Sequence, residues 1–262
     1  MNTPNKPFEQ LEYTVKDAVA YIRLNRPEVL NSFTTQLYGE VKNAFRMADA
    51  DTSVDIIVIT GAGRAFGTGG DLQEVLRRMD DPDPLALYAY DDNMPFDTVK
   101  HCSKTTIAAV NGICVAGGLA IASACDLQVA VRSAVFGAPE ARIGIASSMI
   151  PSLLLPKISL SKLKYLLFTA KSISAVEAER IGLITEVVDD GALETRVQEL
   201  IGEIRKTSPN ARRLYGEYLN RMLPTAPNSD LYRAFSSPEC REGLRAFGEK
   251  RAPGFERREE GK

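Results

Sequence analysis

Two glycine-bearing segments could present bare backbone N–H groups to a ligand. Residues 66–72 read FGTGGDL, and residues 111–118 read NGICVAGG. Each follows a strand-like run rich in β-branched residues, at 55–60 and 105–110, and each leads into a helix-like stretch. The first amides of a helix lack intrahelical partners and can face a negative charge. Two amides that converge on one carbonyl oxygen form an oxyanion hole, which suits the enolate of a thioester.

Glu140 is the carboxylate that could move the proton in such a reaction. It ends residues 136–140, which read FGAPE. If Glu140 lies in an apolar pocket, burial disfavours its charged form and its pKa rises toward the range useful for proton transfer. The alternative is a surface glutamate after a proline turn. Asp71 is a weaker candidate acid, because a carboxylate at the start of a helix is usually a cap.

Five segments in a fixed order give the chain a resemblance to the enoyl-CoA hydratase/isomerase family, also called the crotonase superfamily. They are residues 25–33, 61–72, 107–112, 136–140 and 242–251. One glycine-rich loop alone would be weak evidence, whereas five ordered segments are specific. The resemblance runs nearly end to end. It implies an enzyme that acts on an acyl-CoA substrate through an enolate, with coenzyme A as part of the substrate and no permanently bound cofactor or metal.

The resemblance also implies roles for individual residues. The oxyanion donors would be the backbone N–H groups of Thr68 and Gly117, and Glu140 would be the acid/base. Hydratases of the family divide proton transfer between two glutamates. The first of these falls at Ala120 in this chain, an apolar residue that cannot carry a proton.

The single glutamate is the pattern of the isomerase branch, so the resemblance favours movement of a double bond in an enoyl-CoA. Hydration of a 2-enoyl-CoA is the alternative, with the water held by serine or backbone groups. Other single-carboxylate reactions of the superfamily, such as hydration with retro-aldol cleavage, dehalogenation or decarboxylation, stay open. A rival of another class is a catalytically weak CoA-thioester-binding or scaffolding protein, because a fold alone does not imply an activity.

Coenzyme A carries phosphates and an adenine, so its site needs cations and flat apolar surface. The resemblance implies that Arg26, Val29 and Leu30 border the nucleotide and pantetheine path, and that Phe247 and Lys250 approach it from a neighbouring subunit. Each has a structural alternative. Phe247 lies on an apolar helical face, and Lys250 can be a solvated surface charge.

Three serines and the single histidine complete the candidates. Ser147 or Ser148 could cap the helix before Pro151 or touch the substrate. Ser123 lies one helical turn beyond the missing glutamate and could either reach the site or pack within its helix. His101 has a side chain whose usual pKa suits proton transfer, but it lies outside both glycine segments, and we expect it at the surface.

The elements that position these residues follow a wound α/β pattern. Alternating residues predict a strand pair at 10–15 and 18–24. Thr34 is then expected to cap a helix that runs to about residue 50, with Leu37, Val41, Ala44 and Ala48 on one face. The succession of strand, glycine segment and helix then recurs, with the last strand at 184–188. The resemblance implies a crotonase-like spiral of repeated ββα units over residues 1–190.

Residues 191–262 are expected to form a helical C-terminal extension. Its first helix carries one apolar stripe, and further helices are expected around 209–222 and 230–250. The resemblance implies that this extension is an oligomerisation region in a homotrimer or homohexamer. The apolar stripe of the first helix comprises Val197, Leu200, Ile201 and Ile204.

Residues 77–92 read as an excursion over the pocket that sets acyl specificity.

Composition excludes several other classes of function. The chain has 262 residues, of which 44% are hydrophobic and 25% charged, enough for a substantial core. The net charge of -2, with basic residues spread along the chain, gives no support to binding of nucleic acid or acidic membranes. No apolar run approaches the roughly 18 residues of a membrane span. The four cysteines lack metal-type spacing and indicate reduced thiols. We expect a cytoplasmic protein.

Overall fold

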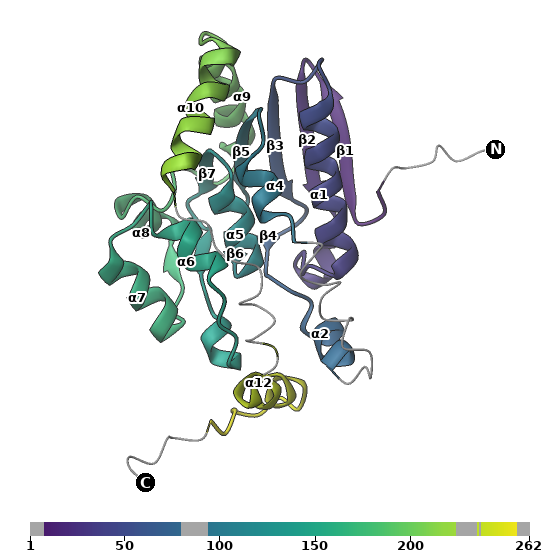
Figure 1. Ribbon diagram of the computed structural model, residues 1–262, viewed down its shortest axis with the longest axis vertical. Coiled ribbons are helices and arrows are strands. Elements are labelled where there is room, and N and C mark those ends of the chain that lie inside the picture. Colours follow the sequence, from purple (N-terminus) through teal and green to yellow (C-terminus); the bar gives the residue numbers. More distant parts are fainter. Residues whose placement is uncertain (1–7, 80–93, 224–234, 236, 256–262) are drawn as a thin grey trace, which may run out of the picture.

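The computed structural model describes residues 8–79, 94–223, 235 and 237–255, and it confirms an α/β fold with a helical C-terminal region (Figure 1). Residues 80–92 of the predicted excursion and 230–234 of the predicted last helix lie outside the described residues. No helix among the described residues is long and apolar enough to cross a membrane.

The larger sheet has six strands in the order β1-β2-β3-β5-β7-β10. The first two strands form an antiparallel hairpin, and each of the others is parallel to its neighbour. The hairpin turns at Asp17 and Ala18, which both have positive φ, as a tight two-residue turn requires. The strands are β1 (Leu11–Lys16), β2 (Val19–Leu24), β3 (Ile56–Gly61), β5 (Thr105–Val110), β7 (Leu127–Val131) and β10 (Glu186–Val188).

The smaller sheet has the order β4-β6-β8-β9, in which the first three strands are parallel. Each of these three follows a strand of the larger sheet and leads into a helix, so the predicted ββα unit occurs three times in succession. The strands are β4 (Ala65–Gly67), β6 (Ile113–Val115), β8 (Val135–Gly137) and β9 (Ile173–Ser174), and the helices that follow the first three are α2 (Leu72–Met79), α5 (Gly117–Ala124) and the 3-10 helix η2 (Glu140–Ile143).

Alternation along the strands divides the core into two layers. Ile57 and Ile59 of β3 belong to the cluster that includes the buried face of α1 (Thr35–Ala50), whereas Ile56 and Val58 pack with α9 (Leu193–Ile204). Both helices bury the residues that the sequence predicts. On α1 these are Leu37, Val41, Ala44 and Ala48, and on α9 they are Val197, Leu200, Ile201 and Ile204.

Hydrogen bonds from side chains fix where several helices begin. The hydroxyl oxygen of Thr34 accepts from the N–H of Leu37, which confirms the predicted cap of α1.

The remaining helices of the described chain are η1 (Pro27–Val29), α4 (Phe96–Lys100), α6 (Met149–Leu154), α7 (Leu160–Thr169), α8 (Ala175–Arg180), α10 (Pro209–Met222) and α12 (Pro238–Gly248).

The helix α12 packs directly on η2 of the same chain (Figure 1). Gly243 of α12 makes this approach possible, because a Cβ added there would overlap the backbone of Ile143. A Cβ on Gly144 would in turn come within 2.7 Å of the backbone of Glu239 and Cys240. The C-terminal helix is thus held against the turn that carries Glu140.

Candidate functional site

The ends of the three parallel strands of the small sheet place three candidate residues around one cavity. Thr68 follows β4, Gly117 follows β6 and Glu140 follows β8. Because β4, β6 and β8 are neighbours, equivalent points of the three repeats meet at one edge. The cavity there has a volume of about 410 Å³, and Thr68, Gly117 and Glu140 all line it.

The two glycine segments touch each other backbone to backbone. Gly69 has φ 86°, and a Cβ added to it would overlap the Cβ of Ala116 and lie 3.3 Å from the nitrogen of Gly117. A Cβ on Gly118 would overlap the carbonyl group of Gly67. Gly117 is the first residue of α5, so its N–H belongs to the helix start and adds the helix dipole to the local field.

The side chain of Thr68 is used inside the protein. Its hydroxyl donates to the carbonyl oxygen of Leu30 at 3.2 Å. This bond ties the loop after β4 to the loop around η1. The threonine side chain therefore holds the loop in position, while any role in an oxyanion hole would belong to the backbone N–H.

Glu140 carries a carboxylate oxygen without a polar partner. Its Oε2 atom is buried and has no hydrogen bond within the described structure. Burial raises the pKa of Glu140 to about 7, although a hydrogen bond to its own backbone amide acts in the opposite direction. Near neutral pH the side chain can therefore accept a proton or donate one, as a general acid/base must.

The position at which the resemblance implies a first glutamate is apolar here. Ala120 lies on α5, is 1% exposed and lines the same cavity as Glu140. Ser147 and Ser148 also line it, and Ser148 occupies the N-cap position of α6 without a capping bond from its side chain. Ser123 is buried in α5 and is not among the residues that line the cavity.

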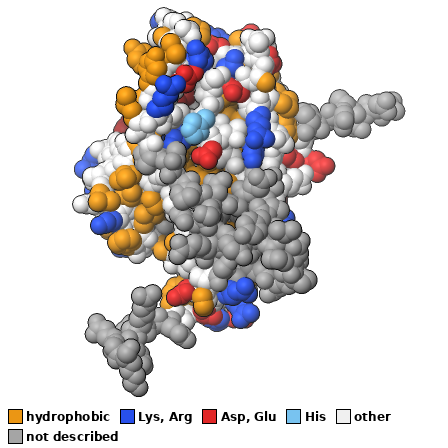
Figure 2. All heavy atoms as spheres, in the orientation of Figure 1, with side chains coloured by type: hydrophobic (Ala, Val, Ile, Leu, Met, Phe, Trp, Pro, Cys, Tyr) orange, Lys and Arg blue, Asp and Glu red, His pale blue; other side chains and the backbone are white. Residues whose placement is uncertain are grey.

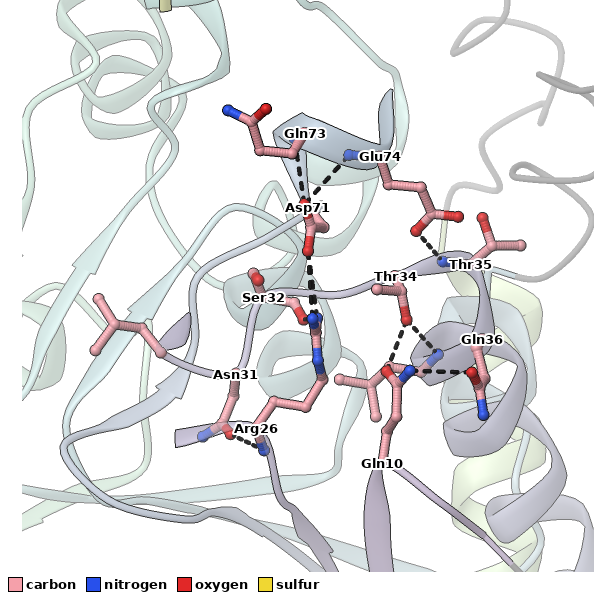
Figure 3. Close-up of polar contacts among 12 residues, drawn as sticks. Gln10, Arg26, Asn31, Ser32, Thr34, Thr35, Gln36, Asp71, Gln73 and Glu74 are labelled. Atoms are coloured by element: carbon pink, nitrogen blue, oxygen red, sulfur yellow. Dashed lines mark hydrogen bonds and ion pairs between the residues drawn. The ribbon is translucent and has the colours of Figure 1, made fainter. Parts of the chain in front are cut away.

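Asp71 is the helix cap that the sequence favours (Figure 3). Its Oδ1 atom accepts from the N–H groups of Gln73 and Glu74, each at 3.2 Å. Its Oδ2 atom faces the guanidinium of Arg26 at 3.4 Å, and Arg26 also donates to the carbonyl oxygen of Ser32 at 2.6 Å. Asp71 therefore joins the start of α2 to the segment around η1.

Of the residues that the resemblance implies for coenzyme A, one lines the cavity and the other four do not. Phe247 lines the cavity, and it does so from α12 of this same chain, where the resemblance implied a neighbouring subunit. Arg26 is engaged with Asp71 and Ser32 and does not line the cavity. Val29, Leu30 and Lys250 also lie outside the cavity wall, and Val29 and Lys250 are exposed.

Other lining residues were not singled out from the sequence. Tyr38 comes from α1, where it reads as one more apolar residue beside the buried stripe. Arg142 supplies the positive charge among the described lining residues, two positions after Glu140 on η2. Arg142 could have been identified in the sequence from its position close to the candidate acid. Tyr38 could have been identified from its polar hydroxyl group on a helix face that is otherwise buried.

Other candidates lie away from the cavity. His101 is exposed, as expected, and its Nδ1 lies 2.9 Å from the carbonyl oxygen of Asp97. All four cysteines are free thiols, and burial raises the pKa of Cys240 to about 12. The described part of the chain contains no group of three or more His, Cys, Asp and Glu side chains that could hold a metal ion.

Known proteins of similar sequence and structure were found over nearly the whole chain. A family model described as enoyl-CoA hydratase/isomerase matches residues 14–258. A probable enoyl-CoA hydratase of Mycobacterium bovis is 34% identical over 248 residues, which cover 92% of this chain and 95% of the relative. The crotonyl-CoA hydratase of Syntrophomonas wolfei is 31% identical over 263 residues, which cover 95% of this chain and 98% of that protein. The crystal structure of an enoyl-CoA hydratase from Mycobacterium avium subsp. paratuberculosis matches with a TM-score of 0.82 at 25% identity, over 96% of this chain and all (100%) of that one.

Proposed function

This chain belongs to the enoyl-CoA hydratase/isomerase family, and we propose that it transfers a proton in an enoyl-CoA substrate with Glu140 as the acid/base. The observation that carries the proposal is the unpartnered Oε2 atom of Glu140 in a mostly apolar cavity that Thr68 and Gly117 also line. The backbone N–H groups of Thr68 and Gly117 hold the thioester oxygen, and negative charge on that oxygen is stabilised as the proton leaves.

Movement of a double bond is the reaction that best fits a single carboxylate. Glu140 takes a proton from the carbon next to the thioester carbonyl of a 3-enoyl-CoA, which leaves a dienolate. It then returns that proton to the carbon two positions further along, and the product is a 2-enoyl-CoA of unchanged mass. No second acid is needed, so alanine at position 120 is compatible with this cycle.

Hydration of a 2-enoyl-CoA is the second candidate, and two observations favour it. The relatives reported above are named as hydratases. Ser147 and Ser148 add hydroxyl groups to the cavity that also holds Glu140. In this reaction the serines orient a water molecule, Glu140 takes its proton as the water oxygen bonds to the β-carbon, and a proton returns to the α-carbon.

The deciding experiment uses 2-enoyl- and 3-enoyl-CoA esters with short, medium and aromatic acyl groups, and resolves the products by mass. Water addition changes the mass and isomerisation does not. Chromatography then separates products of equal mass. Binding of the esters without turnover across the set would support a CoA-binding scaffold and would contradict an enzyme.

The variant Ala120→Glu extends this experiment. It restores a carboxylate at the position of the family's first glutamate, and we expect hydration to gain relative to isomerisation. The side chain enters an apolar wall, so protonation of the new acid limits the gain. A matched variant, Ala120→Gln, has a similar size without an acid and shows the effect of volume alone.

Recognition of the coenzyme A part of the substrate belongs to the same proposal. Phe247 offers an apolar surface at the cavity, and Arg26, Val29, Leu30 and Lys250 are proposed to border the nucleotide and pantetheine. Calorimetry is expected to show tighter binding of a CoA ester than of its free acid. Equal affinities would remove the basis for a CoA site.

Assembly into a homotrimer or homohexamer through residues 191–262 is also proposed, around a spiral core at 1–190. Figure 2 shows hydrophobic side chains gathered over α10, which belongs to this region, and also over α7 of the core. Light scattering tests the assembly, and a fully active monomer would contradict it. The exposed apolar residues on these two helices are Tyr215, Tyr218, Leu219 and Met222 on α10, and Leu160, Tyr165 and Phe168 on α7.

The free cysteines fit a reducing, cytoplasmic place of action.

A further inference from the structure

Tyr38 brings a phenol group to the part of the cavity where the two glycine segments meet. It is 2% exposed, yet it lines the same cavity as Gly117, Ala120 and Glu140. Its hydroxyl lies against Gly117, because a Cβ added to that glycine would overlap the Tyr38 oxygen. A side chain at position 117 would therefore displace the phenol. Gly117 leaves space for the Tyr38 phenol as well as for the contact between the two glycine segments.

Aromatic neighbours hold the Tyr38 ring in place. Phe33 stacks on it with ring centroids 4.6 Å apart and an angle of 13° between the planes. Phe96 meets it edge to face at 5.9 Å and 74°. Contacts of this kind fix the orientation of a ring, so little side-chain freedom remains to be lost when the hydroxyl binds a ligand.

The stacking partner of Tyr38 is itself attached to the loop after β4. The N–H of Phe33 donates to the carbonyl oxygen of Gly69 at 2.8 Å, and the N–H of Asp71 donates to the carbonyl oxygen of Phe33 at 2.8 Å. The phenol and the Thr68 loop thus belong to one connected unit. Its geometry is set before a substrate arrives, as stabilisation of a developing charge requires.

We propose that the Tyr38 hydroxyl donates a hydrogen bond to the thioester carbonyl oxygen of the substrate, as a third donor beside the N–H groups of Thr68 and Gly117. The inference rests on the proposed acyl-CoA function. A phenol, with an ordinary pKa of about 10, is a stronger donor than an amide or an alkyl alcohol. The bond strengthens as the carbonyl oxygen gains negative charge.

The side chains of Thr68 and Ala120, which line the same cavity, do not supply this contact. The hydroxyl of Thr68 donates to Leu30, and Ala120 is apolar. Tyr38 therefore partly compensates for the reduced polarity of the α5 side of the cavity. Its role is charge stabilisation, so it should contribute equally to isomerisation and hydration, because both pass through an enolate.

The variant Tyr38→Phe tests this inference, because it removes one oxygen atom and keeps the ring that stacks on Phe33. The assay is exchange of the α-hydrogen of a saturated acyl-CoA with deuterium in D₂O, which reports enolate formation whatever the final reaction is. We expect the exchange rate and kcat to fall about 10- to 100-fold. This decrease approaches the one caused by removal of a donor from an oxyanion hole. The Kd of the acyl-CoA should change little, because the bond gains strength only as charge develops.

Two control variants separate the hydroxyl from the packing. Tyr21→Phe removes the hydroxyl that accepts from Gln198 at 3.0 Å, outside the cavity lining, and should leave exchange unchanged. Phe96→Leu removes the edge-to-face contact and keeps the Tyr38 hydroxyl, and should lower exchange less than Tyr38→Phe does.

The outcomes distinguish this inference from the proposed function. If the native protein neither turns over CoA esters nor exchanges their α-hydrogens, the acyl-CoA function is wrong. If the native protein is active and Tyr38→Phe matches it, Tyr38 only packs and the inference fails. A loss confined to hydration would also overturn it, because the hydroxyl would then act on water and not on the carbonyl oxygen.

Discussion

The first and third ββα repeats each place a carboxylate after a strand of the small sheet, and the two carboxylates have opposite surroundings. Asp71 follows β4 and is bonded on both oxygens, to the start of α2 and to Arg26. Glu140 follows β8 and leaves Oε2 buried without a partner. Carboxylates at similar places in the spiral are therefore suited to different roles, because their hydrogen-bond partners differ.

The difference separates a role in structure from a role in chemistry. A carboxylate that accepts several hydrogen bonds holds the backbone that it touches. A carboxylate in an apolar wall is stabilised in its neutral form and stays ready to exchange a proton.

The largest effect is expected for Glu140→Gln. Glutamine keeps the shape of the side chain but cannot exchange a proton, so kcat should fall by about two to four orders of magnitude. Circular dichroism and the Kd of a CoA ester should stay close to those of the native protein. Glu194→Gln is the control, because it changes an exposed glutamate at the start of α9. Turnover at the native rate by Glu140→Gln would refute the proton-transfer role.

The pH dependence of kcat/KM should report the same group. The pKa of Glu140 is raised to about 7. The proposed cycle begins with the charged form of this side chain. Activity should therefore decrease as pH falls below about 7, by about tenfold per unit. A pH–rate profile of the free enzyme measures this limb. A limb with a midpoint near the ordinary pKa of glutamate would contradict the burial of Glu140.

The contribution of Glu140 to the free energy of unfolding should change with pH in the direction opposite to activity. Because the folded protein raises the pKa of Glu140 from 4.5 to about 7, it binds a proton that the unfolded chain releases between these values. The native protein should therefore lose stability relative to Glu140→Gln as pH rises from about 4.5 to about 7. Urea unfolding of both proteins across this range isolates the contribution, since glutamine does not titrate. A constant difference would show that Glu140 is solvated in the folded state.

The role of Asp71 should appear in stability more than in chemistry. Asp71→Ala removes the acceptor for two N–H groups of α2 and the partner of Arg26, which should lower the free energy of unfolding by about 1–2 kcal/mol. Asp71→Asn keeps an oxygen for the helix start and should cost less. Urea unfolding measures both. If Asp71→Ala lowered kcat as much as Glu140→Gln with full stability, the division between the two acids would be wrong.

The sequence predicted the elements that local patterns encode. The face of α1, its Thr34 cap, the stripe of α9 and the cap at Asp71 all rest on spacing within a few residues, and the structure confirms them. Contacts between distant segments were harder to predict. Tyr38 reads as a core residue of α1, and only the fold brings its hydroxyl to Gly117, nearly eighty positions later. Close packing of α12 at Gly243 also brings Phe247 to the cavity of its own chain, a contact that the sequence did not predict.

The smallest effect concerns two alanines with positive φ, one inside the site and one outside it. Ala116, the N-cap of α5, has φ 52° and ψ -126°, and Ala18 in the β1–β2 turn has φ 56°. An alanine in such a conformation is strained where glycine is not, but glycine also raises the entropy of the unfolded chain. Each alanine-to-glycine change should therefore add no more than about 1 kcal/mol to the free energy of unfolding. Urea unfolding measures the gain.

Activity then distinguishes the two positions. Ala18→Gly should leave kcat unchanged, because the turn is remote in the fold from the cavity lining. Ala116→Gly removes the methyl group that packs against Gly69 and gives freedom to the residue before the proposed donor Gly117. A looser donor stabilises the enolate less well, so kcat should fall while stability rises. If Ala116→Gly were more stable and equally active, the strain at position 116 would have no part in positioning the N–H of Gly117.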